Sequence, residues 1–180
     1  NIGVELRIVP EIKSVQGILE KIKCVASIMD VELKATKIIE TKYTDLLVQL
    51  ENNRKKVSEK NISAMVIYSM QGTSPIVSGS GESGDAFLKM LGAQNAFSSF
   101  KGWKPVSAES IIANDPDFII VTNRLLKRFS SLNELKSHPA LAQTTAAKKN
   151  QILAKDGMAM MGFGPRTIEC ALDVSKVFSK

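Results

Sequence analysis

The sequence predicts an α/β fold, a three-layer α/β/α sandwich with a mostly parallel sheet, together with one long helix. Three observations predict it. Apolar runs of strand length recur at residues 64–68, 118–121 and 152–154. Segments with helical apolar spacing lie between these runs. Glycine and proline separate the segments. Strands that alternate with helices in this way form parallel sheets covered on both faces.

The first helical pattern follows a short strand. Residues 4–9 predict that strand, and Ser14 is in position to cap a helix whose apolar spacing continues to Met29. A second, longer helix is expected from about residue 32 to about residue 59. Its apolar stripe fades after Asn52, which predicts that the charged end packs lightly or projects from the body.

The remaining elements are shorter. A helix is expected over residues 86–91, and residues 101–105 predict a loop. Ser107 is expected to cap the next helix. The last helix opens at Pro165, since proline is favoured in the first turn of a helix.

Length and composition agree with a globular domain. The chain has 180 residues, 44% hydrophobic and 23% charged, and a chain of this size needs no disulfide or metal to be stable. No apolar run reaches the roughly 18 residues that a membrane span requires. The chain does not begin with a recognisable export signal, so we expect any such signal to have been removed or to lie outside this sequence.

Charge and cysteine content restrict the class of ligand. The net charge of +6 suits an anionic ligand or an acidic partner. Nucleic acid is not expected, because aromatic residues are only 6% and the basic residues are dispersed. The single histidine, His138, and two distant cysteines, Cys24 and Cys170, exclude a zinc site of the usual spacing. The redox state of the cysteines is left open.

Two segments are candidates for ligand contact. The glycine-rich residues 78–85 follow a strand and precede a helix, a context in which backbone N–H groups bind anions, although the segment lacks a P-loop lysine. A plain flexible turn is the alternative. In residues 162–166, Arg166 occupies a first helical turn, where the helix dipole disfavours a cation. A salt bridge to Glu169, a ligand carboxylate, or packing against the preceding loop would each account for it.

Catalysis is not expected. His138 has no histidine or cysteine partner nearby, and no strained serine motif is present. Tyr68 is interpreted as a half-buried packing residue or, alternatively, a phenolate ligand for a metal. Met70 and Met161 are core residues or part of a cleft for a broad, polarisable ligand.

The order of these motifs resembles the C-terminal half of periplasmic haem (hemin)-binding proteins of bacterial haem ABC transporters. These belong to a helix-linked substrate-binding family of the cobalamin and siderophore type. The resemblance covers essentially all of the chain and is carried by Asn95 and residues 107–109, 116–117 and 162–166. It implies residues 1–31 as the end of an N-terminal lobe, 32–60 as the connecting helix and 61–180 as the C-terminal lobe.

The resemblance implies a periplasmic component of an ABC importer that captures haem as its transported ligand and makes or breaks no bond. Its partners would be haem, the permease and the ATPase of the importer, with membrane contact only through the permease, and the full-length protein would be a monomer. The usual axial iron ligand would come from an N-terminal lobe that we expect to lie largely outside this sequence. The alternative ligands are a ferric siderophore or a cobalamin-like ring.

The resemblance also suggests site residues. The candidates for the haem cleft are Tyr68, Met70, Ser80, Lys101, Trp103, Lys104, Met161, Phe163 and Arg166. Tyr68 and Met70 are the candidates for an iron ligand, and Glu82 and Asp85 are the candidates for docking to the permease. Relatives often carry arginine and threonine in the glycine loop, where this chain has Ser80 and Glu82.

Two further classes of protein remain as alternatives. A metallocluster enzyme with the same architecture would need cluster ligands, for which two cysteines are too few. The other alternative is an interaction module, which would associate through the surface that the missing lobe would cover.

Overall fold

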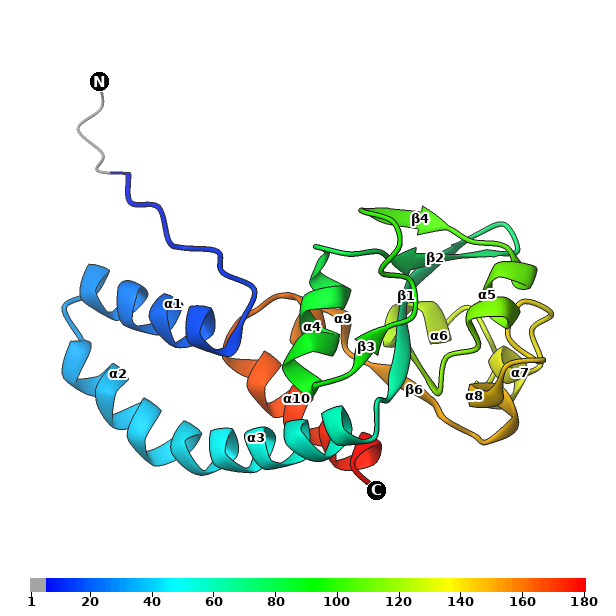
Figure 1. Ribbon diagram of the computed structural model, residues 1–180. Coiled ribbons are helices and arrows are strands. Elements are labelled where there is room, and N and C mark those ends of the chain that lie inside the picture. The colour runs from blue at the N-terminus through cyan, green and yellow to red at the C-terminus, as the bar shows by residue number, and fades with distance from the viewer. Residues whose placement is uncertain (1–5) are drawn as a thin grey trace.

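A six-stranded sheet organises residues 6–180, the part of the chain that the computed structural model describes (Figure 1). The strands are β1 (Ser63–Gln71), β2 (Ser74–Ser78), β3 (Gln94–Asn95), β4 (Trp103–Pro105), β5 (Phe118–Thr122) and β6 (Ile152–Lys155). Their order is β4-β2-β1-β5-β6, and β3 also pairs with β1. Only the pairs of β2 with β1 and with β4 are antiparallel. The prediction of a mostly parallel sheet is confirmed.

Helices cover both faces of this sheet. They are α1 (Val15–Ile28), α2 (Glu32–Ile38), the π-helical turn η1 (Ile39–Tyr43), α3 (Thr44–Glu59), α4 (Ser83–Leu91), α5 (Ala108–Asn114), α6 (Asn123–Leu126), α7 (Leu132–Lys136), α8 (Thr145–Lys148), α9 (Gly157–Met161) and α10 (Pro165–Phe178). No helix among residues 6–180 combines the length and the apolar character that a bilayer crossing demands.

Two apolar clusters, one on each face, hold the layers together. Val66 and Ile120 pack with α3, α4 and α10, whereas Met65 and Ile119 pack with α5 to α8. Successive strand residues point to opposite faces, so strands that are apolar throughout serve both clusters. The three-layer sandwich predicted from the apolar runs is therefore confirmed.

The long helix spans the predicted residues, but its two ends behave in the opposite way to the prediction. It runs from α2 through η1 to α3, and Val57 near its end is fully buried. Asn53 donates from Nδ2 to Ser175 Oγ of α10 at 3.0 Å. A polar side chain thus makes the contact with α10 at this position, so the apolar stripe is interrupted although the helix is still packed. The exposed end is α2, where Leu33 is 88% exposed and which lies beside α1 away from the sheet (Figure 1).

The predicted strand at residues 4–9 is not formed in the part that is described. Residues 6–9 pair with no strand, and Leu6 and Ile8 are exposed; residues 4 and 5 lie outside the described range. A strand needs a neighbouring strand to pair with, and among residues 6–180 no strand of the sheet pairs with this segment. The cap at Ser14 is confirmed, since its Oγ accepts from Gly17 N at 3.0 Å.

The hairpin region also departs from expectation. Residues 101–105 contain the edge strand β4 where a loop was predicted, and β2 was not predicted. Both strands are short, and their pairing depends on β1. The apolar pattern of such short edge strands is too brief to read from sequence.

Both cysteines are free. Cys170 is half-buried on α10, and burial raises the pKa of its thiol to about 11. At neutral pH this thiol is protonated and poorly nucleophilic.

The burial of Val57 leads to a stability prediction. Val57→Ala should lower the free energy of unfolding by about 2 kcal/mol, because two buried methyl groups are lost and a cavity remains. Urea unfolding followed by circular dichroism measures it. Val48→Ala on the same helix, where Val48 is 56% exposed, is the matched control and should change stability by less than about 0.5 kcal/mol. Equal effects of the two variants would contradict the burial of this end of the helix.

Candidate functional site

A hollow of about 800 Å³ opens at the edge of the sheet where β1, β5 and β6 end. Ligands of open α/β sheets bind at the carboxyl ends of the strands. The lining of this edge hollow has three chemically distinct parts. They are an aromatic wall (Tyr68 and Trp103), a methionine wall (Met158 and Met161) and a cationic wall (Arg124 and Lys127).

The aromatic wall depends on an irregularity in β1. The register between β1 and β2 shifts between Ile67 and Ser69, which makes a β-bulge at Tyr68. Tyr68 is 47% exposed and lines the hollow. It lies 5.6 Å from the Trp103 ring between centroids, at an interplanar angle of 53°. The sequence analysis predicted both residues for the cleft, and both line the hollow.

The same bulge moves Met70 away. In a regular strand Met70 would share a face with Val66, but the extra residue of the bulge switches it to the face of Met65 and Ile67. Met70 is 8% exposed in that cluster. It does not line the edge hollow, in contrast to the expectation from sequence, and its sulfur is not available there as an iron ligand.

The methionine wall comes from α9, which follows β6 directly. Asp156 caps this helix, with its Oδ1 accepting from Ala159 N at 2.7 Å. Met158 and Met161 are three residues apart and therefore lie on one side of the helix. Met158 is 71% exposed and Met161 half-buried. Polarisable thioethers suit a broad, flat, apolar ligand.

The cationic wall was missed by the sequence analysis. Arg124 on α6 and Lys127, the C-cap residue that follows this helix, are exposed. The helix comes immediately after β5. The signal was available, because both follow the predicted strand at 118–121 and parallel strands present ligand contacts at their carboxyl ends. Asp156 also lines the hollow, so two cations and one carboxylate border it.

Three residues predicted for the cleft gather instead around Phe100, beside the hollow. Ser80 Oγ donates to the Phe100 carbonyl oxygen at 2.9 Å, and Ser80 forms a bridge with Lys101. Lys104 Nζ lies 5.4 Å from the centre of the Phe100 ring. Both lysines are exposed, and none of the three lines the hollow.

Residues 162–166 lie partly in the core and partly on the surface. Phe163 has a left-handed backbone, with φ 44°, and is buried in the cluster under α10. Arg166 is exposed. The salt bridge considered for it is not formed, because Glu169 pairs with Lys42 at 2.7 Å. Neither Phe163 nor Arg166 lines the edge hollow.

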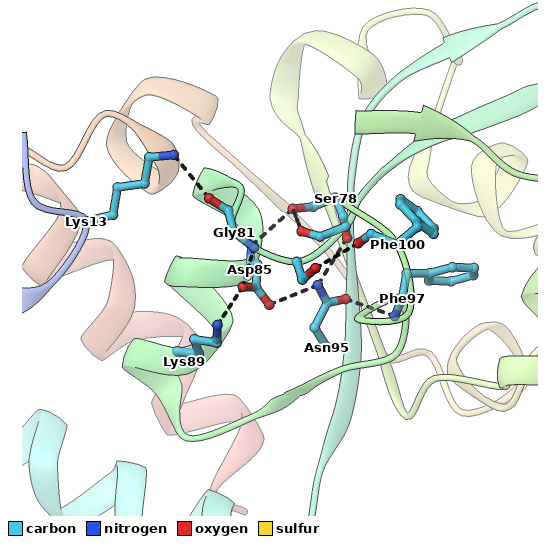
Figure 2. Close-up of polar contacts among 10 residues, drawn as sticks. Lys13, Ser78, Gly81, Asp85, Lys89, Asn95, Phe97 and Phe100 are labelled. Carbon is cyan, nitrogen blue, oxygen red and sulfur yellow. Dashed lines mark hydrogen bonds and ion pairs between the residues drawn. The ribbon is translucent and has the colours of Figure 1, made fainter. Parts of the chain in front are cut away.

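Asp85 is part of an internal network, which Figure 2 shows. One carboxylate oxygen accepts from Gly81 N at 2.9 Å and from Lys89 Nζ at 2.7 Å, and the other accepts from Asn95 Nδ2 at 3.1 Å. Its side chain is only 2% exposed. A permease arginine could not reach this carboxylate, so the docking role is withdrawn for Asp85. It stays a prediction for Glu82, which is half-buried ahead of α4.

The opposing effects on Asp85 favour its charged form. Burial acts to raise the pKa of Asp85, but the hydrogen bonds from Lys89, Gly81 and Asn95 and the Lys89 charge outweigh it. The pKa therefore lies below its ordinary value. The network fixes the glycine turn against the start of α4, since Asp85 N also donates to Ser78 Oγ at 3.0 Å.

The glycines in this turn are needed for close packing. A Cβ at Gly79 would lie 2.5 Å from Phe100, and one at Gly84 would lie 2.7 Å from the Ser78 side chain. Side chains at these positions would clash. Packing therefore accounts for both glycines without an anion.

A second hollow of about 690 Å³ lies between α1, α3 and α4. Leu50 and Met90 line it, and its cations have partners: Arg54 pairs with Glu51, Lys89 pairs with Asp85, and Lys13 Nζ donates to the Gly81 carbonyl oxygen at 3.3 Å. The edge hollow, where Arg124 and Lys127 stand beside exposed aromatic and thioether groups, is therefore the better candidate for an anionic apolar ligand.

Within residues 6–180, no cluster of three or more histidine, cysteine or carboxylate side chains could hold a bare metal ion. Tyr68 is the residue of the edge hollow that carries a phenol group.

Comparison with known proteins identifies a family. Residues 4–157 match the family model described as periplasmic binding protein. No curated protein matches the chain.

Solved structures share the fold. The periplasmic heme-binding protein HutB of Vibrio cholerae has a TM-score of 0.81 and 28% identity, with 97% of this chain and 68% of that chain covered. The periplasmic heme-binding protein BhuT, in complex with two hemes, has a TM-score of 0.78 and 22% identity, with 94% of this chain and 64% of that chain covered. An ABC-type Fe3+-hydroxamate transport system from Saccharomonospora viridis has a TM-score of 0.70 and 19% identity, with 93% of this chain and 57% of that chain covered. This chain spans less than two thirds of the length of BhuT.

The Asp85 network leads to a pH prediction. Asp85→Asn should lower the free energy of unfolding at pH 7 by about 1–3 kcal/mol, because Gly81 N and Lys89 lose a charged acceptor. A carboxylate with a lower pKa in the folded than in the unfolded protein stabilises the fold at pH values above its unfolded pKa, which is about 3.9 for aspartate. This stabilisation is lost as the pH falls through the folded pKa. The difference between the two proteins should therefore narrow below about pH 4.

Chemical unfolding at a series of pH values measures this difference. Asp45→Asn, at an exposed position on α3, is the control and should track the parent protein at every pH. A difference for Asp85→Asn that stays constant from pH 7 to pH 3 would show that the carboxylate is not held ionised by the network.

Proposed function

The chain belongs to the periplasmic binding protein family, and from that premise we propose that it is the haem-binding part of an ABC importer. It captures haem in the periplasm and passes it to the permease, and no bond is made or broken. The fold likeness to heme-binding proteins such as HutB supports this choice of ligand.

The division of the edge hollow into apolar and cationic walls carries the proposal. Haem is a flat apolar ring with two carboxylates at one edge. The Tyr68–Trp103 pair and the methionine wall offer apolar, polarisable surface. Arg124 and Lys127 offer charge for the carboxylates on the opposite wall. A volume of about 800 Å³ is within the range of small-molecule sites.

Tyr68 is the proposed iron contact on this lobe. Its phenol stands in the hollow at a β-bulge, and bulges commonly aim side chains at functional sites. Phenolate is a known haem ligand. A second contact would come from an opposing lobe, which the family resemblance supplies.

Partner contacts are proposed on the same basis. Glu82, at the start of α4 and next to the hollow, is the docking candidate for a permease arginine. A monomeric full-length protein is proposed, since its own second lobe would cover the hollow.

A ferric hydroxamate chelate is the second candidate ligand, because one structure of the same fold belongs to a Fe3+-hydroxamate transport system. A chelate with a filled iron coordination sphere leaves no position for Tyr68. Haem leaves axial positions open, so the two ligands predict different roles for this residue.

The cationic wall gives the first binding prediction. Titration of the chain with hemin should shift the Soret band, and Arg124→Ala should weaken binding about tenfold, or about 1.4 kcal/mol, through loss of a charged hydrogen bond. Lys148→Ala, an exposed cation on α8 outside the hollow, is the charge-matched control with unchanged affinity. Arg166→Ala, measured alongside, tests the residue proposed from sequence. Absence of any hemin-dependent spectral change would reject the haem assignment.

Tyr68 gives the second binding prediction. Tyr68→Phe keeps the ring against Trp103 but removes the phenol oxygen, so the charge-transfer and Soret bands of the hemin complex should change. Affinity for a ferric hydroxamate should stay the same in this variant. Identical hemin spectra for the two proteins would assign Tyr68 to packing.

A further inference from the structure

We propose that Thr122 is the positioning residue of the edge hollow: one buried side chain holds the aromatic, cationic and methionine walls in their relative places. This deepens the proposed function and rests on it for the identity of the ligand. Thr122 is the last residue of β5, is 3% exposed, and borders the hollow.

The hydroxyl hydrogen of Thr122 makes a hydrogen bond to the aromatic wall. The paired register of β1 and β5 ends at Ile67 and Val121, because β5 turns into α6 after Thr122. The Tyr68 carbonyl oxygen at the bulge lies just beyond this last pair. Thr122 Oγ1 donates to that oxygen at 3.0 Å. The Thr122 side chain thus adds one hydrogen bond between β1 and β5 beyond the last backbone pair. This bond holds Tyr68, whose ring packs on Trp103.

The hydroxyl oxygen of Thr122 serves the cationic wall. It accepts from Leu125 N at 3.0 Å, which makes Thr122 the N-cap of α6. The helix has four residues, and so short a helix has little stability of its own. The cap therefore decides where Arg124 and Lys127 stand. One oxygen atom is shared between the bulge and the cap, so the two walls are coupled through it.

The methyl group of Thr122 serves the methionine wall. A Cβ at Gly157 would lie 3.2 Å from Thr122 Cγ2, so the start of α9 packs closely on this methyl group. Gly157 precedes Met158 and follows the Asp156 cap. The position of α9 relative to α6 is therefore set by contact with the same side chain.

Burial makes the two hydrogen bonds of Thr122 hard to replace. A buried group that loses its partner is not compensated by water and carries the full cost of desolvation. Removing the hydroxyl leaves the Tyr68 carbonyl and the Leu125 amide without this partner. We expect the bulge and the first turn of α6 to move apart, which separates the aromatic and cationic walls that a ligand must contact together.

Two substitutions separate the parts of the side chain. Thr122→Val keeps the methyl contact and removes the hydroxyl, whereas Thr122→Ser keeps the hydroxyl and removes the methyl group. Trp103 is the only tryptophan of the chain, so its fluorescence in the ligand-free protein reports on the aromatic wall. Thr122→Val should shift the Trp103 emission and weaken hemin binding about tenfold. Thr122→Ser should leave the emission in place and retain most of the affinity.

Thr144→Val is the matched control. Thr144 is also a fully buried N-cap of a four-residue helix, with its Oγ1 accepting from Ala147 N at 3.1 Å and donating to Leu141 O at 2.7 Å. It does not line the hollow. Thr144→Val should lower stability as Thr122→Val does, yet leave Trp103 emission and hemin affinity unchanged.

The outcomes are distinct. Unchanged emission and affinity in Thr122→Val would overturn the proposal, and so would equal changes in Thr144→Val, since these would reflect general loosening. If the parent chain binds no hemin, the proposed function fails, while the emission of the ligand-free variants still decides whether Thr122 positions the aromatic wall.

Discussion

The candidate site depends on one constraint, the need of two neighbouring parallel strands to satisfy their backbone hydrogen bonds where they stop pairing. β1 and β5 part after Ile67 and Val121. β1 continues through a bulge toward its hairpin, and β5 turns into α6. Polar backbone groups at such a divergence require partners. Thr122 supplies both a donor and an acceptor at this point, so the geometry of the edge hollow follows from how the divergence is closed.

The bulge has two consequences that belong together. It turns Tyr68 toward the hollow and sends Met70 to the opposite cluster. A regular strand could not do both, because alternation would place Tyr68 and Met70, which are two residues apart, on the same face as Val66. The glycine turn is fixed separately, through the buried Asp85 and its contacts with Gly81 and Asn95. Ser83, at the end of the glycine turn, and Tyr68, at the bulge, both line the hollow, and the methionine and cationic walls complete it.

Part of the site could be predicted from sequence. Tyr68, Trp103 and Met161 are among the cleft residues that the family resemblance suggests, and they line the hollow. Arg124 and Lys127 were not predicted, although they follow a predicted strand, where ligand contacts of parallel sheets lie. Ser80, Lys101 and Lys104 were predicted for the cleft, yet their contacts are with Phe100 and they do not line the hollow.

The sequence by itself determined the layers of this protein, because apolar runs of strand length and helical spacing are local patterns that only a covered parallel sheet accommodates. It also determined the caps at Ser14 and Ser107, which act within a few residues. Tertiary structure alone decided the burial of Val57 and Asp85, the face of Met70 and the shared oxygen of Thr122. Asn53 of α3 depends on Ser175 and Thr122 on Tyr68, partners that are distant in the chain. Asp85 and Met70 depend on how the glycine turn and the bulge of β1 fold against neighbouring segments. Local apolar spacing carries no information about such contacts.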